Sequence, residues 1–300
     1  MEKLQGSFTA LVTPMNQDGS VDYASFEKLV DFQIASGITG LLVLGTSGET
    51  PTLTEDEEDV LIEIAAKKCA DAKKAGRPVT LILGAGSNCT LDSVHYMERA
   101  KRAEADYALV VTPYYNKPSD EGVYAHFAAA SAVGVPIIVY NIAGRTGKNI
   151  SCELLARIAD LPNIAGVKEA SGNITQMMEV IEKIVPRHPD FCVLCGDDAL
   201  TLPLMALGGD GVISVVSNSA PAEIAALVRF CLDKDFDAAR KMHYRLLPFM
   251  RAAFIETNPA PIKFALAQKG LIQNNVRLPL VPVLPQSEKA IKDALEKSGL

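Results

Sequence analysis

The sequence has few of the residues that would build a disulfide scaffold or a metal centre. Six cysteines in 300 residues are too few for a disulfide framework. Cys192 and Cys195 form a C-x-x-C pattern, but they lie on a predicted strand, where residues three apart point to opposite faces. The four histidines show no metal-ligand spacing. We therefore expect buried, reduced cysteines, no metal site and a cytoplasmic protein.

Long apolar runs and an excess of positive charge are also lacking. No apolar stretch approaches the roughly 18 residues of a membrane-spanning helix, and residues 1–6 carry no signal-peptide pattern. The 29 basic and 36 acidic residues give a net charge of −7. This balance disfavours nucleic acid and anionic membranes as partners. Small anionic substrates remain compatible with it, because a local cluster of donors can override the global field.

What the chain does have is a repeated pattern of a short apolar run, a loop and an amphipathic helix. The runs lack alternation, as is typical of parallel strands buried on both faces. Eight such units predict an α/β fold, a (β/α)8 TIM barrel over residues 1–228. The alternative, a doubly wound sheet, usually has fewer strands and a G-x-G-x-x-G after the first one, which is missing here. The eight runs are Phe8–Val12, Gly40–Leu44, Val79–Leu83, Tyr107–Val111, Pro136–Tyr140, Ile164–Lys168, Cys192–Gly196 and Gly211–Val215.

The remaining residues, 229–300, show helical periodicity over 236–255, 260–269 and 287–297. No low-complexity linker precedes them. We expect a C-terminal helical appendage attached to the barrel.

Lys168 ends the apolar run Ile164–Lys168 and therefore stands at the carboxyl end of a predicted barrel strand. Catalytic groups of such barrels gather at these strand ends. Burial disfavours the charged form of lysine, and a neutral amine can attack a ketone to form a Schiff base. The simpler alternative is a lysine that caps a strand and pairs with Glu169 in solvent.

Tyr140 ends the preceding strand, so its phenol is predicted to face the same cavity and to move protons for the amine. Arg145, on the loop that follows, offers a guanidinium fork for a carboxylate. A core tyrosine and a solvated arginine are the simpler interpretations. Asp197 and Asp198 follow the end of the seventh predicted strand and could bind a metal, but a helix N-cap explains them more simply.

Two loops add further candidates. Gly45–Thr50 places hydroxyls between glycines, so that backbone N–H groups and hydroxyls can donate to a carboxylate; an ordinary glycine turn is the alternative. Thr112–Pro118 sets two adjacent tyrosines between prolines, which also fits a packing or interface loop. An amine, a phenol, a guanidinium and an anion-binding turn are thus expected at one rim of the barrel.

Together these segments resemble the dihydrodipicolinate synthase/N-acetylneuraminate lyase family of Schiff-base aldolases. The resemblance covers nearly the whole chain. Thr112–Asn116 and Arg145–Gly147 are similar to the synthases of the family, whereas the sialic acid lyases lack an arginine at that place. The resemblance implies pyruvate and L-aspartate-4-semialdehyde as substrates and 4-hydroxy-tetrahydrodipicolinate as the product, on the way to diaminopimelate and lysine. The matching motifs are Phe8–Pro14, Gly45–Glu49, Tyr140–Ile142, Gly166–Ala170, Gly211–Ser214 and Asn258–Lys263.

The resemblance implies that Lys168 forms the imine with pyruvate and that Tyr140 transfers the protons. Thr46 would link Tyr140 to Tyr115 in a hydroxyl relay. No external cofactor or metal is implied, because the imine is itself the electron sink. Family members supply the equivalent of Tyr115 from a neighbouring subunit, so a homo-oligomer is expected, at least a dimer and, by family likeness, a dimer of dimers.

The substrate contacts implied by the resemblance involve five residues. Thr46 and Ser47 would hold the pyruvate carboxylate, and Arg145 would bind the carboxylate of the semialdehyde. Gly196 and Ile213 would line the pyruvate pocket through backbone groups. Ser47 replaces a threonine common among the synthases but keeps the hydroxyl. Ala143 replaces a common proline, which predicts a looser loop around Arg145.

Lysine-inhibited members of the family bind lysine at the dimer interface. Inhibited bacterial enzymes often carry histidines where this chain has Glu55 and Glu58. We therefore expect weak or absent inhibition by lysine. The positions that match this possible allosteric site are Thr50, Pro51, Glu55, Glu58, Asn88, Asp92 and Tyr114.

Two other functions compete with the synthase interpretation. One is another pyruvate-dependent aldolase of the same family, acting on a keto-sugar acid or a hydroxy-oxoglutarate, against which Tyr115 and Arg145 argue. The other is a non-catalytic sensor of pyruvate or lysine, which the intact set of Lys168, Tyr140 and Thr46 disfavours.

Overall fold

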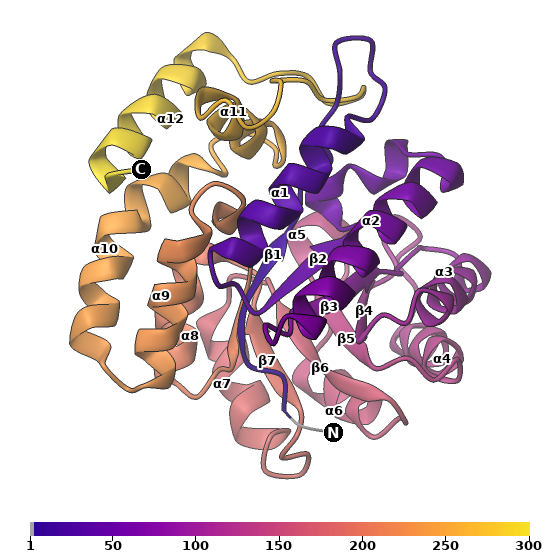
Figure 1. The fold of residues 1–300 in the computed structure, drawn as a ribbon. Coiled ribbons are helices and arrows are strands. Elements are labelled where there is room, and N and C mark those ends of the chain that lie inside the picture. The colour runs from indigo at the N-terminus through magenta and orange to yellow at the C-terminus, as the bar shows by residue number, and fades with distance from the viewer. Residues whose placement is uncertain (1–2) are drawn as a thin grey trace. The chain divides into compact units, whose positions relative to one another are not determined.

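The computed structural model describes residues 3–300. Eight parallel strands close into a barrel in chain order, from β1 to β8 (Figure 1). Their continuous apolar character matches their burial, since nearly every strand residue is inaccessible to solvent. The predicted (β/α)8 barrel is confirmed. The strands are β1 Gly6–Ala10, β2 Gly40–Val43, β3 Thr80–Gly84, β4 Tyr107–Val111, β5 Ile137–Asn141, β6 Ile164–Glu169, β7 Cys192–Cys195 and β8 Gly211–Ser214.

Helices alternate with the strands. Those that follow β1 to β7 are α1 Tyr23–Ala35, α2 Glu55–Lys74, α3 Thr90–Arg102, α4 Asp120–Ser131, the short α5 Ala143–Thr146 with α6 Cys152–Ala159, α7 Ile174–Lys183 and α8 Thr201–Ala206. Beyond β8 lie α9 Pro221–Leu232, α10 Phe236–Ala252, α11 Ala260–Gln268 and α12 Pro285–Ser298. The expected C-terminal helices are therefore present, while the predicted domain boundary at residue 228 stays a prediction.

The packing within the chain divides it into two units. Unit 1 comprises residues 3–6 and Thr80–Ile213, and thus β3 to β7 with most of β8. Its helices pack in sequence, α3 against α4, α4 against α6, α6 against α7 and α7 against α8. The N-terminal segment is fixed beside β7 by Asp210, whose carboxylate accepts hydrogen bonds from Gln5 Nε2 and from the backbone N–H of Val193.

Unit 2 comprises Ser7–Val79 and Ser214–Leu300, so the first and last parts of the chain pack together. Gln33 on α1 donates to the backbone carbonyls of Ser217 and Asn218, and Thr9 donates to Gln33. Asn218 in turn accepts a hydrogen bond from the backbone N–H of Val12. Helix α10 packs against α9 and α12, which run beside it (Figure 1).

The six cysteines are free, and Cys192 and Cys195 are buried in β7. Burial raises the pKa of the Cys192 thiol to about 12 and that of Cys195 further still, which suppresses the reactive thiolate. The prediction that the C-x-x-C pair is buried is confirmed, while its reduced state stays a prediction. Within residues 3–300, no helix combines the length and the apolar character needed to cross a membrane.

Candidate active site

Lys168 is the penultimate residue of β6, and only 5% of its surface is exposed. Its aliphatic stem passes Gly196, the residue after β7. A Cβ atom added at Gly196 would lie 3.1 Å from Lys168 Cε and 2.6 Å from the Cβ of Ala170. The position therefore needs glycine because the lysine side chain fills the space that a larger residue would take. Gly196 and Lys168, both predicted site residues, are brought together.

The electrostatic surroundings of Lys168 favour the neutral amine. Burial lowers its pKa from 10.5 to about 8, the charges of Asp198 and Cys195 act in the opposite direction, and the charge of Arg145 lowers the pKa further. At pH 7 a pKa of about 8 leaves about one amine in ten neutral, against about one in three thousand for an ordinary lysine. The interpretation of Lys168 as a solvated strand cap is wrong, because the side chain is buried and the carboxylate of Glu169 is engaged elsewhere.

Tyr140 lies directly beside Lys168. Strands β5 and β6 pair in parallel with Tyr140 opposite Lys168, and the amine is 4.3 Å from the centroid of the phenol ring. Since both side chains leave neighbouring strands on the same face, the ring covers the amine and helps to exclude water from it. This contact places a group that can donate and accept a proton next to the amine.

The next residues along the two strands, Asn141 and Glu169, point to the opposite face and form a buried polar network. Asn141 Nδ2 donates to Glu169 Oε2 at 3.0 Å, and Gln176 Nε2 on α7 donates to the same oxygen at 3.1 Å. The other oxygen, Oε1, accepts the backbone N–H of Ser171 at 2.7 Å. With these bonds the network holds the ends of β5 and β6 in register, and so fixes Tyr140 and Lys168.

Arg145 lies on α5, the single helical turn after β5, and is exposed. The turn ends at Gly147 in the left-handed conformation, with φ of 70°. Asn141, which precedes this turn, is hydrogen-bonded to the residues that follow it. Its Nδ2 donates to Asn149 Oδ1 at 2.9 Å, and its Oδ1 accepts from the backbone N–H of Ile150 at 3.1 Å. The segment that starts at Ala143 is thus a helical turn whose flanking residues are hydrogen-bonded to each other.

Tyr115 is not assembled with these groups within one chain. Its side chain is 88% exposed and its φ is 71°, an unusual conformation for a tyrosine. The loop is fastened beside it, since Asn116 Nδ2 donates to the backbone carbonyl of Asn88 at 2.8 Å. The remaining predicted residue of unit 1, Ile213, is buried in β8.

In unit 2, the turn after β2 carries Thr46 and Ser47. Both belong to a short 3-10 helix, Thr46–Gly48, with Thr46 exposed and Ser47 buried. Asn258, in the segment between α10 and α11, donates from Nδ2 to Ser47 Oγ at 3.0 Å. The predicted anion-binding turn therefore has a buried polar contact from a residue 211 positions away.

The end of the same turn is fixed by a buried ion pair. Glu49 and Lys263 on α11 have side chains that are 0% exposed, and Lys263 Nζ donates to Glu49 Oε1 at 2.5 Å. The second carboxylate oxygen of Glu49 accepts the backbone N–H of Arg277 at 2.8 Å. Arg277 also donates from Nη1 and Nη2 to the two carboxylate oxygens of Glu57, and this interaction lowers the pKa of Glu57 to about 2.

The positions that match the lysine site of the family fall in both units. In unit 2, Thr50 and Pro51 lie in a second 3-10 helix, Thr50–Thr52, and Glu55 and Glu58 lie in the first turn of α2. Glu58 is buried and Glu55 is exposed. In unit 1, Asn88 precedes α3, Asp92 lies in its first turn, and Tyr114 is exposed on the loop after β4.

Sequence reasoning misses three residues that contact or act electrostatically on residues of the candidate site. The sequence suggests Asp198 only as a cap or a metal ligand; the structure gives the cap to Asp197, and the buried carboxylate of Asp198 acts on Lys168. Asn258 and Lys263 belong to a motif that the resemblance includes, Asn258–Lys263, but it assigns them no role. No local pattern marks them, because their partners lie more than two hundred residues away.

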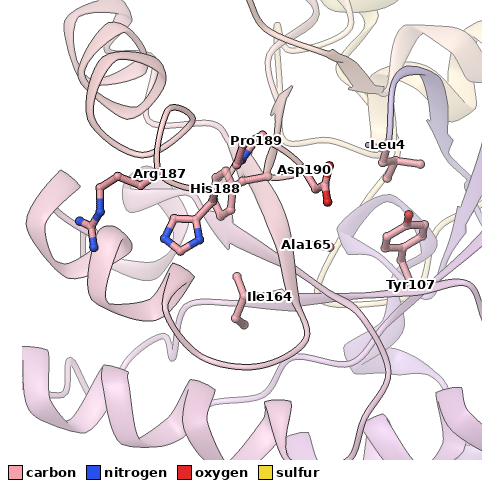
Figure 2. Close-up of a pocket in the computed structure, with 9 residues that line it drawn as sticks. Leu4, Tyr107, Ile164, Ala165, Arg187, His188, Pro189 and Asp190 are labelled. Atoms are coloured by element: carbon pink, nitrogen blue, oxygen red, sulfur yellow. The ribbon is translucent and has the colours of Figure 1, made fainter. Parts of the chain in front are cut away.

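A separate pocket of about 290 Å³ opens at the amino ends of β4, β6 and β7 (Figure 2). None of the site residues lines it. Its wall includes Tyr107, Ile164, His188 and Asp190. Because barrel enzymes place their chemistry at the carboxyl ends of the strands, we assign this pocket no catalytic role.

The fold and the site together define a class, namely (β/α)8-barrel enzymes with a buried lysine and a neighbouring tyrosine at the carboxyl ends of two barrel strands. The comparisons with known proteins are more specific. The model of the dihydrodipicolinate synthetase family matches residues 3–298, and the chain belongs to this family.

Individual relatives match over nearly the full length. The 4-hydroxy-tetrahydrodipicolinate synthase of Hydrogenobaculum sp. (strain Y04AAS1) is 46% identical over 299 residues, which cover 99% of each chain. The crystal structure of dihydrodipicolinate synthase from Aquifex aeolicus is similar with a TM-score of 0.93 at 42% identity, covering 99% of each chain. That of the chloride-inhibited synthase from Acinetobacter baumannii, complexed with pyruvate, gives a TM-score of 0.93 at 37% identity over 99% of each chain.

Proposed function

We propose that the chain condenses pyruvate with L-aspartate-4-semialdehyde to 4-hydroxy-tetrahydrodipicolinate, in the diaminopimelate route to lysine. The observation that carries the proposal is Lys168, a buried lysine with its pKa lowered to about 8 and a tyrosine ring 4.3 Å from its amine. Membership of the family and the pyruvate complex of the relative from Acinetobacter baumannii support the same substrate.

In the proposed reaction the neutral amine of Lys168 attacks the ketone carbon of pyruvate, and the carbinolamine loses water to give the imine. Tyr140 donates the proton that the departing hydroxyl needs and later accepts one from the methyl group, which yields the enamine. The enamine carbon then attacks the aldehyde carbon of the semialdehyde, so that the C=O π bond breaks, its oxygen takes up a proton to become the 4-hydroxyl group, and the imine at Lys168 re-forms. Attack by the α-amine of that substrate on the imine closes the ring and releases Lys168, so that one water is lost overall.

The other predicted residues take their roles around this step. Thr46 and Ser47 hold the pyruvate carboxylate through N–H and hydroxyl donors, with Gly196 and Ile213 lining the pocket. Arg145 binds the carboxylate of the semialdehyde; its charge already acts on Lys168, which supports a shared site. The protonated imine serves as electron sink, so the proposed chemistry needs no cofactor or metal.

We further propose that the active protein is a homo-oligomer, at least a dimer, whose partner subunit supplies Tyr115 to the proton relay with Thr46 and Tyr140. The 88% exposure of Tyr115 and its strained φ support a side chain that is held out for a neighbouring subunit. The free cysteines fit a cytoplasmic location.

The proposal is tested by incubating the protein with pyruvate, reducing with borohydride and measuring intact and peptide masses. We expect a pyruvate-derived adduct on Lys168 and none in the Lys168→Ala variant. Turnover is then compared for L-aspartate-4-semialdehyde and a panel of other aldehydes. An absent adduct on folded protein would refute the mechanism, and faster turnover of a sugar aldehyde would refute the assigned substrate.

A further inference from the structure

The contact between Asn258 and Ser47 determines which way the serine hydroxyl can donate. A hydroxyl has one O–H donor and two acceptor lone pairs. Asn258 Nδ2 donates to Ser47 Oγ at 3.0 Å, so the serine accepts this bond and keeps its own O–H for another acceptor. Both side chains are buried, so this bond is shielded from competition by water.

The surroundings of Ser47 are held rigidly from the same C-terminal part of unit 2. Within the turn, the backbone N–H groups of Gly48 and Glu49 donate to the carbonyls of Gly45 and Thr46. Glu49 has a φ of 57°, and its carboxylate is fixed by the amine of Lys263. A left-handed glutamate persists only where its neighbours hold it, and here a fully buried ion pair does so.

We propose that Asn258 is a positioning residue for pyruvate. By donating to Ser47 Oγ it leaves the serine O–H pointing to the substrate carboxylate, while the Glu49–Lys263 pair keeps the turn in place. The inference rests on the proposed function, in which Ser47 binds this carboxylate. It makes the segment between α10 and α11 part of the recognition of the substrate anion.

The test is the Asn258→Asp variant, because a carboxylate has nearly the same shape as the amide but can only accept hydrogen bonds. The aspartate takes the serine O–H as its own donor and adds a negative charge beside the substrate anion. The rate constant for borohydride-trapped imine on Lys168 is measured with pyruvate and with pyruvamide, its uncharged amide. We expect the rate with pyruvate to fall on the order of tenfold to a hundredfold, as for a lost hydrogen bond to a charged group, and the rate with pyruvamide to fall less than about threefold.

Asn275→Asp is the matched control. Asn275 lies between α11 and α12, and its Nδ2 donates to the backbone carbonyl of Met15 and to Gln273 Oε1, both at 3.3 Å, rather than to Ser47. Its ratio of pyruvate to pyruvamide rates is expected to equal that of the wild type. Should Asn258→Asp melt below the assay temperature, Asn258→Ala replaces it, with a smaller selective loss of about threefold to tenfold with pyruvate.

The outcomes separate the inference from the proposed function. If the wild type traps pyruvate and the Asn258 variant loses rate with both ketones equally, or with neither, the positioning role is overturned. If the wild type forms no adduct with either ketone, the proposed function is wrong and the inference falls with it. A selective loss with pyruvate supports both.

Discussion

Replacing Lys168 with methionine should make the protein more stable at neutral pH while abolishing imine formation. Methionine fills a similar volume beside Gly196 and Tyr140 but carries no charge to bury. The lysine is 5% exposed, and burial is the first cause of its lowered pKa. A lowered pKa means that the folded state binds the proton less tightly than the unfolded state does, which costs stability.

The size of this cost follows from the shift. The lowering of the pKa from 10.5 to about 8 corresponds to a free-energy cost of about 3 kcal/mol. Below pH 8 the amine is charged in both states and the full cost acts on the folded wild type. Between pH 8 and 10.5 only the unfolded state binds the proton, so wild-type stability rises with pH. At pH 9.5 about 1 kcal/mol of this cost should remain.

Urea unfolding of both proteins at pH 7 and pH 9.5, at one protein concentration, measures this difference. The stability advantage of Lys168→Met should shrink by about 2 kcal/mol between the two pH values. Differences in packing between the lysine and methionine side chains act equally at both pH values and cancel. The control, Lys73→Met on the exposed face of α2, should change stability by less than about 0.5 kcal/mol at either pH. Equal pH dependence of wild type and Lys168→Met would refute the burial argument.

Four further outcomes are expected. Gly196→Ala, whose Cβ would lie 3.1 Å from Lys168 Cε, should slow borohydride trapping of pyruvate on the order of tenfold or more, and unchanged trapping would show that the close packing is unimportant. Tyr115→Phe should lower turnover by about a hundredfold without reducing the yield of adduct; undiminished turnover would remove Tyr115 from the relay. Arg277→Lys should destabilise the protein above pH 4.5, where Glu57 is charged in both states, and the loss should narrow as the pH falls towards 2, as urea unfolding would reveal. Steady-state assays with added lysine should show weak or no inhibition, and strong inhibition at sub-millimolar lysine would contradict this.

The barrel is predictable because strands that are buried on both faces have sequences that are continuous apolar runs. The ends of the strands are less predictable. The apolar pattern predicts Phe8–Val12 for the first strand, and β1 spans Gly6–Ala10. Leu11 and Val12 are as buried as the strand itself, but Val12 N–H bonds the side chain of Asn218 rather than a neighbouring strand. Apolar character reports burial, whereas the end of a strand is set by where the ladder of hydrogen bonds stops.

The site can be predicted only where one short segment carries the signal. Lys168 and Tyr140 each end an apolar run, and the rule that strand ends face a common cavity is enough to pair them. Lys263 gives the opposite impression, because it lies between Ile262 and Phe264 on a largely apolar helix and its partner Glu49 is 214 positions away. Long-range polar contacts of this kind depend on the packing of the whole unit, which no local pattern encodes.

The surroundings of the two buried lysines explain why Lys168 is suited to chemistry and Lys263 to a structural role. Burial lowers the pKa of both. For Lys263 the charge of Glu49, and the hydrogen bond that its carboxylate accepts directly from the amine, act against this lowering. Lys168 feels the Asp198 carboxylate through its charge and lies against a tyrosine ring, so the cost of burial is offset only in part. The uncompensated remainder is the same free energy that populates the neutral amine at pH 7. The stability that Lys168→Met is expected to gain is therefore the quantity that, in the wild type, makes the lysine a nucleophile.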